Sequence, residues 1–456
     1  MQWHRSCLEN PCHPTGIIES FLNLIPKNID PEVKQDATDF TRDRKLPFPK
    51  LIAFILSLTA SGKSRGVDIK SGEFFKTARR SGLWPDAEAV HRSALTHARG
   101  KVPWTVFSGI FRDAVDLAYK LWPRDPSSLW HGMSVFAFDG SKYDLPATPQ
   151  IREEFDPHSG LQHEGKGHYP QCLVTTAYDV FRRLPVARSV AGIHGSERDE
   201  AQALLPSIPS RSVLLFDRGY PSYEFISYLR ENHKGYFLFR CPAASTFPAV
   251  ESFVASGGQE GFILLDPSNN YLKGLSRRQR KKAKIIQLRI IRLVSPDGTV
   301  SVLLTNLLNM AAFPGKEIIN LYFRRWAVED HYRNEKVVLE IEKFHGKGSN
   351  SIRQELFAVA IMSVITRTLM VITQRAHGSG RLECQFKNAI MTLAAEAAVL
   401  VPDDPAKAAE IFSEILGAIS RVKYYRPKSP RPTQPRVAKK APNKWCVGRR
   451  NKLKEA

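Results

Sequence analysis

The feature that most constrains the fold is the alternation of strand-like and helix-like segments between residues 134 and 240. Apolar stretches suited to buried strands, such as SVFAF and SVLLF, alternate with segments that carry helix signals, such as SERDEAQALLPSI. The order along the chain, β-β-β-α-β-α-β, predicts an α/β layer built on a mixed sheet. At 456 residues the chain is long enough for further regions around this layer.

Helical and β-rich segments flank the predicted layer. Apolar periodicity with Gly and Pro breaks predicts helices before it, and three strand-like stretches between basic and turn-rich segments predict a β-rich insertion after it. Beyond Pro314 the pattern is helical again, and the chain ends in a basic, Pro-rich tail. The expected regions are 1–125 (helical, DNA-binding), 126–240 (first part of the core), 241–314 (insertion), 315–350 (core helix), 351–422 (C-terminal helices, a candidate dimerisation surface) and 423–456 (tail).

The charge balance indicates the class of partner. Sixty-six Lys and Arg against 45 Asp and Glu give a formal net charge of +21 and a pI of about 9.7, which favours a polyanion, nucleic acid above all. No apolar run approaches the roughly 18 residues needed to span a bilayer, so no membrane partner is expected. The N-terminus has no export-signal pattern, and the six scattered Cys suit reduced thiols, so a cytoplasmic protein is expected.

Two aspartates share an unusual placement. Asp139 follows SVFAF and Asp217 follows SVLLF, so each is expected at the end of an apolar strand, just before a Gly-containing turn. The ends of strands are where sheets present ligands, and a carboxylate there is costly unless it is solvated or bound. The alternative for each residue is a simple turn or helix-cap Asp.

A third carboxylate lies on a predicted helix, in LYFRRWAVEDHYRNEK. At about 100° per residue, four side chains fall within an arc of about 60° on one helix face. They are Tyr322, Arg325, Glu329 and Lys336. Arg325 lies four residues before Glu329, close enough to pair with it and keep it ionised. The alternative is a solvated helix face, and Trp326 is expected to pack the helix in place.

These residues suggest phosphoryl transfer on DNA. Three carboxylates can hold two divalent ions roughly 4 Å apart, which align a nucleophile and stabilise a leaving oxygen. Mg²⁺ (or Mn²⁺) prefers oxygen ligands, so Asp139, Asp217 and Glu329 are the expected metal ligands and catalytic residues. Arg325 and Lys336 would hold phosphates, with Tyr322 as a hydroxyl donor or stacking surface.

Two further basic segments are candidates for DNA contact. The segment DAEAVHRSALTHARGKVP is predicted to be a helix that directs Arg92 and Arg99 to DNA, unless it is an ordinary basic surface helix. The run SRRQRKKAK carries Arg278, Arg280 and Lys281, which would add salt-dependent backbone contacts, unless the run is a solvated loop.

The spacing Y-x2-R-x3-E-x6-K from Tyr322 to Lys336 resembles the signature of the DDE transposases of insertion-sequence family four. FDGSKYDLP around Asp139 and DRGY at Asp217 resemble the segments that carry the first two catalytic aspartates of that family. The resemblance implies a ribonuclease-H-like mixed-sheet catalytic core interrupted by the β-rich insertion, with helical N-terminal and C-terminal regions. It also implies a bacterial protein that associates with the nucleoid when bound to DNA.

The function implied by this resemblance is transposition. The protein would bind the terminal inverted repeats of an insertion sequence, nick their DNA and join the freed 3′-hydroxyl to target DNA, as a homodimer because two ends must be paired. The alternative is a catalytically inactive DNA-binding derivative that represses transposition. A glycoside hydrolase would explain carboxylates at strand ends, but it would not explain the net charge of +21.

Overall fold

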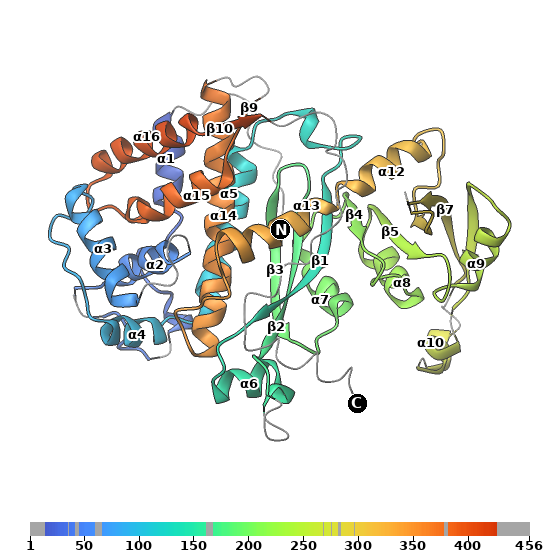
Figure 1. Ribbon diagram of the computed structural model, residues 1–456, viewed down its shortest axis with the longest axis horizontal. Coiled ribbons are helices and arrows are strands. Elements are labelled where there is room, and N and C mark those ends of the chain that lie inside the picture. The colour runs from blue at the N-terminus through green and yellow to red at the C-terminus, as the bar shows by residue number, and fades with distance from the viewer. Residues whose placement is uncertain are drawn as a thin grey trace.

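The structure is a computed structural model that describes residues 14–34, 36–41, 45–59, 66–160, 167–267, 269–274, 276–280, 284–295, 297–377 and 382–425. A sheet runs through the middle of the molecule, and a body of helices lies on one side of it (Figure 1). On the other side the sheet extends into an arm, formed by the strands and short helices within residues 241–314. Its eight strands lie in the order β3-β2-β1-β4-β5-β8-β7-β6.

The strands of this sheet are β1 (Val135–Asp144), β2 (Gln171–Asp179), β3 (Leu184–Gly192), β4 (Val213–Phe216), β5 (Tyr236–Pro242), β6 (Glu260–Leu265), β7 (Ile286–Val294) and β8 (Val300–Thr305). A separate pair is formed by β9 (Leu382–Cys384) and β10 (Lys423–Tyr425). The helices that precede α12 are α1 (Pro14–Leu22), α2 (Phe48–Ser57), α3 (Val67–Arg80), α4 (Arg92–Gly100), α5 (Trp104–Leu121), α6 (Pro149–Phe155), α7 (Glu197–Leu204), α8 (Tyr223–Asn232), α9 (Pro248–Ala255), α10 (Asn269–Gly274) and α11 (Arg277–Arg280). The later helices are α12 (Gly315–Phe323), α13 (Trp326–Arg333), α14 (Ser349–His377), α15 (Phe386–Ala395) and α16 (Pro405–Arg421).

The α/β layer predicted from the sequence is present, and its sheet is mixed. β1 pairs antiparallel with β2 and parallel with β4, which in turn pairs parallel with β5. α7 begins at the predicted cap, where the Ser196 side chain accepts a hydrogen bond from the backbone N–H of Asp199. Ser222 caps α8 in the same way. The short helix α6, between β1 and β2, was not predicted.

The strands predicted within residues 241–314 are also present, and they extend the central sheet. β8 pairs antiparallel with β5 and with β7, and β7 pairs with β6. Buried Arg289 on β7 donates to Glu260 on β6, with its Nε 2.6 Å from Glu260 Oε1. This segment therefore lengthens one continuous sheet rather than forming a sheet of its own.

The helical body is organised around α14, which packs against α5, α15, α16 and α2 (Figure 1). By length and composition, Ser349–Ala376 is apolar enough to cross a membrane, with a mean hydropathy of 2.0, so the expectation that no segment reaches that length was wrong. Isolated polar residues interrupt its apolar runs, so each run is short, but the mean hydropathy of the helix stays high enough for a membrane-spanning segment. Of its most apolar window, 83% is buried inside the protein, which is typical of the core helix of a helical body.

The predictions for the helix around Arg92 and for the C-terminal tail differ from the structure. α4 begins at Arg92, capped by His91, rather than near Asp86. Its buried residues are Leu95 and Arg99. In the predicted tail, residues 423–425 form β10 against β9, and residues 426–456 lie outside the described residues.

Candidate active site

Asp139 and Asp217 are brought side by side by the packing of the residues before them. β1 and β4 pair in parallel up to Ala137 and Leu215. Beyond that pair, the buried rings of Phe138 and Phe216 stack with centroids 5.1 Å apart. Because side chains alternate between the faces of a strand, the next residue of each segment points to the opposite face. The repeated Phe-Asp therefore places two carboxylates together.

Asp139 is not at the end of its strand, as the sequence suggested. β1 continues to Asp144, and Asp139 pairs with Thr176 of β2. β4 stops at Phe216, so Asp139 lies where β1 loses its parallel neighbour and the sheet opens. Asp217 follows β4 as expected and also acts as a turn residue, since its Oδ1 accepts from the backbone N–H of Gly219 at 2.8 Å.

The helix predicted to carry Glu329 is broken. α12 ends at Phe323, α13 begins at Trp326, and residues Asn334–Val338 form a π-helix. At the junction, the N–H groups of Arg325 and Val328 donate to carbonyls only three residues earlier, on Tyr322 and Arg325. The turn is therefore tighter there and wider after Arg333, so one arc of 100° steps does not describe the four side chains.

Arg325 nevertheless brings most of the predicted residues together. Its Nη2 lies 2.5 Å from Glu329 Oε1, and its Nη1 lies 4.0 Å from Asp139 Oδ2. Its guanidinium also lies 6.0 Å from the ring centre of Tyr322, which is itself buried. α13 contacts β1 and lies across the sheet (Figure 1), and Arg325 stands between its Glu329 and Asp139.

Lys336 contacts β1 three residues beyond Asp139, at Lys142. Its Nζ donates to the backbone carbonyl of Lys142 and lies 4.7 Å from the ring centre of Tyr143. Between Glu329 and Lys336, the Tyr332 hydroxyl donates to the carbonyl of Asp139 at 2.6 Å. The sequence did not single out Tyr332, although it fixes α13 directly to the backbone of the first aspartate.

The candidate site holds more acid than base. Burial raises the pKa of Asp139 to about 7; the charges of Asp217, Glu197 and Glu329 add to the rise, and Arg325 opposes it. Burial likewise raises the pKa of Tyr322 to about 12. Glu197, the first residue of α7, is a carboxylate that the sequence reading missed. Its only sequence signal was its place at the start of a capped helix.

A second cluster of charges lies just beyond the site, in the interior. Glu335, in the π-helix, accepts from Arg188 Nη2 at 2.6 Å and from the Tyr143 hydroxyl at 2.5 Å, and its Oε1 lies 3.2 Å from His331 Nε2. Burial by itself would raise the pKa of Glu335, but Arg188 and His331 hold it below its ordinary value. The sequence could not indicate this cluster, because Arg188 is 147 residues away.

The donors suit a hard divalent cation in kind, since all are carboxylate oxygens. Within the described part of the chain, however, no three acidic, His or Cys side chains lie close enough to hold an ion as they stand. Glu329 is instead paired with Arg325. The parallel register of β1 and β4 brings Asp139 and Asp217 to neighbouring positions, and Glu329 would have to leave Arg325 to join them.

Of the two DNA contacts predicted on α4, one is exposed and the other is buried. Arg92 is exposed at the start of α4, with its Nε 3.9 Å from Asp68. Arg99 is buried, and its guanidinium donates to Gln354, Glu355 and the carbonyl of Ser351. Arg99 therefore joins α4 to α14, and its donors are not available for DNA.

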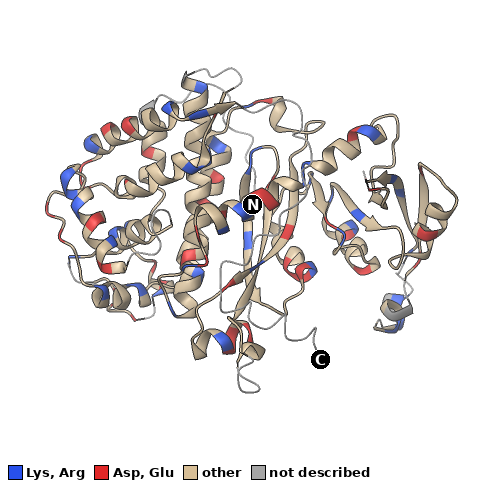
Figure 2. Cartoon of the chain, in the orientation of Figure 1, with Lys and Arg blue, Asp and Glu red and all other residues tan. Residues whose placement is uncertain are grey.

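The basic run of the arm is described only in part. Arg280 is exposed, whereas the side chain of Arg278 and all of Lys281 lie outside the described residues. Figure 2 shows Lys and Arg over the helices at one end of the molecule and on the short helix α10 at the other. Basic residues thus lie on both sides of the central sheet.

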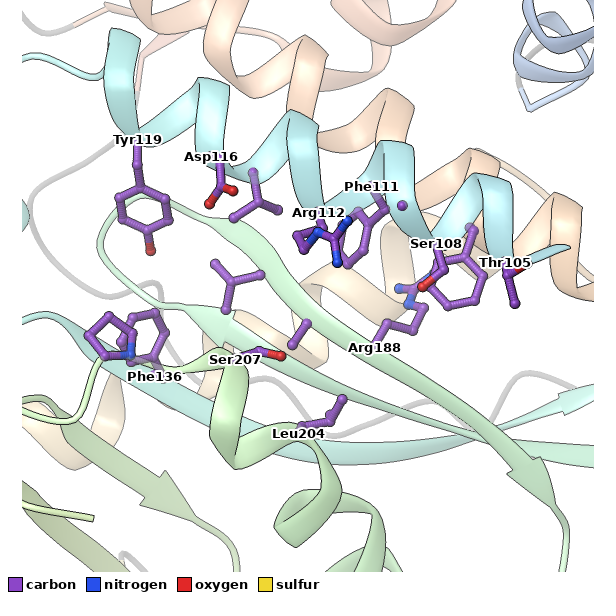
Figure 3. Close-up of a pocket in the computed structure, with 16 residues that line it drawn as sticks. Thr105, Ser108, Phe111, Arg112, Asp116, Tyr119, Phe136, Arg188, Leu204 and Ser207 are labelled. Carbon is purple, nitrogen blue, oxygen red and sulfur yellow. The ribbon is translucent and has the colours of Figure 1, made fainter. Parts of the chain in front are cut away.

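Two other features are separate from the carboxylates. Trp326 is 43% exposed beside Arg325, so the expectation that it packs the helix in place was wrong. A cavity of about 320 Å³ lies between α5 and β3, where Asp116 and Arg188 line it (Figure 3). None of the three predicted catalytic carboxylates lines this cavity.

Comparisons with known proteins identify the family. The sequence model described as the transposase DDE domain matches residues 130–365, which is more than half of the chain and includes Asp139, Asp217 and Glu329. The chain is 23% identical over 364 residues to the transposase InsG for insertion sequence element IS4 of Escherichia coli (strain K12), covering 77% of each. It is 29% identical over 162 residues to InsZ, a proposed transposase of the same organism, covering 34% of this chain and 52% of InsZ.

A likeness among solved structures is more distant. The piggyBac transposase, in a synaptic complex with hairpin DNA, matches with a TM-score of 0.43 at 10% identity, over 88% of this chain and 85% of that one. A DDE domain implies dependence on a divalent metal ion. The sequence match over the layer that carries the three carboxylates means that the chain belongs to the DDE transposases of the IS4 type, enzymes that cleave and transfer DNA.

Proposed function

We propose that this chain cuts DNA at the ends of its insertion sequence and joins the cut ends to target DNA, with Asp139, Asp217 and Glu329 as its catalytic carboxylates. The observation that carries the proposal is the pairing of β1 with β4, which sets Asp139 beside Asp217 under the stacked phenylalanines. Glu329 faces the same aspartates from α13, through Arg325.

The strand order β3-β2-β1-β4-β5 supports a ribonuclease-H-like core, with residues 241–314 as an insertion that lengthens its sheet. On this proposal, residues 1–125 and the basic arm bind the terminal inverted repeats and the flanking backbone. Two protomers would hold two ends, with residues 351–422 as the candidate contact between them. Arg92 and Arg280 remain proposed DNA contacts, as do Arg278 and Lys281.

The carboxylates would bind two Mg²⁺ or Mn²⁺ ions. Bound divalent cations supply positive charge beside both the attacking and the leaving oxygens of a phosphoryl transfer. In nicking, the oxygen of water bonds to the phosphorus, the P–O3′ bond breaks, and the 3′ oxygen leaves with a proton. In joining, that 3′-hydroxyl attacks a target phosphorus, loses its proton, and displaces the 3′ oxygen of the target strand.

The other residues of the Y-x2-R-x3-E-x6-K spacing would act on the substrate rather than on the ions. Arg325, released from Glu329, can donate two parallel hydrogen bonds to a phosphate. Lys336 can bind a neighbouring phosphate along β1, because it already lies against the backbone of Lys142. Tyr322 is held as a neutral hydroxyl donor, because burial raises its pKa to about 12.

Glu329→Gln tests the proposal. The variant keeps the size of the side chain but removes its charge, so we expect binding to element-end DNA to persist while Mg²⁺-dependent nicking falls by roughly 100-fold or more. Asp330→Asn is the matched control, because Asp330 is exposed and paired with Arg333 on the same helix. Nicking that is unchanged in Glu329→Gln would contradict the assignment.

The alternative, an inactive repressor derivative, predicts a different result for the unmodified chain. It would bind the terminal repeats with the same salt dependence but would leave the DNA intact at every Mg²⁺ or Mn²⁺ concentration. Gel analysis of end-labelled DNA with the unmodified chain distinguishes the two, independently of any variant.

A further inference from the structure

We propose that Glu197 is a fourth carboxylate of the candidate active site and binds one of the divalent cations together with Asp139 and Asp217. The inference rests on the proposed function, because it requires a cation site at the two aspartates. The pattern of three acids read from the sequence gives Glu197 no role.

The position of Glu197 follows from the connection between β3 and β4. It is the first residue of α7, directly after the capping residue Ser196. α7 packs against β1, β2 and β3, so its first turn lies beside the place where β1 continues beyond the end of β4. Glu197 thus approaches the aspartates from α7, whereas Glu329 approaches them from α13.

Gly140 shows how closely the Glu197 carboxyl group approaches the strand. A Cβ atom at Gly140 would lie 2.7 Å from Glu197 Cδ and 2.8 Å from its Oε1, closer than such atoms can pack. Gly140 is the residue after Asp139, and its backbone is extended within β1. The glycine that reads as a turn signal in the sequence therefore makes room for a carboxyl group next to the first aspartate.

The surroundings of Glu197 do not satisfy its charge. It is half-buried and forms no ion pair with any Lys or Arg in the described ranges. Burial and the charge of Asp217 raise its pKa, and the hydrogen bond from Tyr220 and the charge of Lys142 oppose the rise without cancelling it. A carboxylate at a helix N-terminus is ordinarily stabilising when it is exposed, as Asp199 is in the same turn. A half-buried carboxylate beside two others is costly, and a bound cation would offset that cost.

Tyr220 provides an independent observation that points to a ligand. Its side chain is fully buried, and its hydroxyl lies close enough to Glu197 to lower the pKa of that carboxyl group as a hydrogen-bond donor. The hydroxyl has no other hydrogen-bond partner in the described part of the chain. The charges of Glu197, Asp139 and Asp217 all act on this hydroxyl. Buried hydroxyl groups in proteins normally have a hydrogen-bond partner. Glu197 is therefore the one described partner of a buried hydroxyl that faces three carboxylates, which leaves its oxygen available to a cation or to a water molecule bound to one.

Ligand number favours a fourth carboxylate. Two hard cations need about six oxygen ligands each, and three carboxylates supply only a fraction of them. Glu197 on α7 and Glu329 on α13 both act electrostatically on Asp139, from two different helices. Each glutamate would therefore serve one of the two ions.

The test is the affinity of the full-length chain for Mn²⁺ in the absence of DNA. Electron paramagnetic resonance measures the concentration of free Mn²⁺ during the titration. We expect Glu197→Gln to weaken Mn²⁺ binding by about tenfold or more, since metal-site residues have effects of this order. Asp199→Asn is the matched control and should leave the affinity within about twofold, because Asp199 is exposed in the same helical turn. An affinity that is the same in Glu197→Gln and in the unmodified chain overturns the proposal.

The variant Gly140→Ala tests the role of the Glu197 carboxyl group in Mn²⁺ binding without changing Glu197 itself. The added methyl group would displace the Glu197 carboxyl group while leaving every ionisable residue in place, so Mn²⁺ affinity should fall as it does in Glu197→Gln. Thermal melting with and without Mn²⁺ separates binding from folding. A role limited to stabilising α7 would lower the melting temperature without Mn²⁺ and leave the Mn²⁺-induced rise intact, which would contradict the proposal.

The two proposals fail in different ways. If Asp139→Asn loses Mn²⁺ binding and nicking while Glu197→Gln retains both, the catalytic proposal stands and the role of Glu197 is wrong. If the unmodified chain neither binds Mn²⁺ nor nicks DNA, the catalytic proposal fails and Glu197 has no cation to bind.

Discussion

Two clusters of charged side chains lie on one stretch of chain, α13 and the π-helix after it, and they differ in how their charges are balanced. In the interior, Glu335 is surrounded by Arg188, His331 and Tyr143, all within hydrogen-bonding reach of its carboxylate. In the candidate active site, Arg325 is the cation that the described structure places between Asp139 and Glu329.

The difference in charge balance appears in the pKa values of the Glu335 and Asp139 carboxyl groups. Burial acts on both, but Arg188 and His331 hold the pKa of Glu335 below its ordinary value, whereas the pKa of Asp139 rises to about 7. A balanced buried cluster fixes the fold, and a cluster with surplus acid is stabilised by an added cation. Charge balance, rather than burial alone, distinguishes the interior cluster around Glu335 from the candidate active site around Asp139.

The largest effect is expected from breaking the balanced cluster. Arg188→Met would leave Glu335 buried without its main partner, which should lower the free energy of unfolding by about 3–5 kcal/mol. Urea denaturation followed by circular dichroism measures the loss. Lys343→Met is the matched control, because it breaks the exposed pair with Glu340 and should cost less than about 1 kcal/mol. Equal losses for the two variants would mean that Glu335 does not depend on Arg188.

A gain in stability is expected from the unbalanced cluster. The folded-state pKa of Asp139 is raised, so the metal-free protein loses stability as the pH rises from the ordinary Asp pKa through about 7. Asp139→Asn removes that loss and should stabilise the metal-free protein at pH 8 by on the order of 2 kcal/mol. The gain should be smaller at pH 5, where most of the folded protein already carries a neutral Asp139. Thermal melts at both pH values in a chelator check this, and a destabilised variant at pH 8 would refute it.

The smallest effect is expected at the edge of the candidate site. Trp326→Ala removes a large side chain that is 43% exposed, so we expect a cost of about 1 kcal/mol or less. A Trp that packed the helix in place would cost about 3–5 kcal/mol. Urea denaturation distinguishes the two, and a cost in the larger range would restore the packing role read from the sequence.

The layer of the fold was predictable because its signals are local. The apolar stretches ending in Phe138 and Phe216, and the capped helix at Ser196, each specify one element without help from distant residues. The break between α12 and α13 was not predictable, because apolar periodicity continues across it while the backbone tightens at Arg325. The continuation of β1 beyond Asp139 depends on pairing with β2, which a single strand does not reveal.

The candidate site was predictable only in its outline. The spacing of Glu329 and its neighbours, with two Phe-Asp segments before it, was enough to identify three carboxylates. The positions of Arg99 and Glu197 were not, because each depends on an element far away in the sequence. Arg99 looked like a DNA contact until α14 supplied Glu355 as its partner. Glu197 looked like a helix-cap neighbour until Gly140 of β1 came within contact distance.

The amino-acid sequence was enough to indicate a large excess of basic residues, three carboxylates at characteristic spacings, and an alternating α/β segment to carry them. Which charged groups are paired and which face surplus charge depends on the three-dimensional fold. Arg188 and Arg325 are the same residue type, yet Arg188 is paired within a balanced interior cluster and Arg325 faces surplus acid. The reason is physical: the energy of a charge depends on its burial and on its neighbours in space, and folding brings those neighbours from far along the chain.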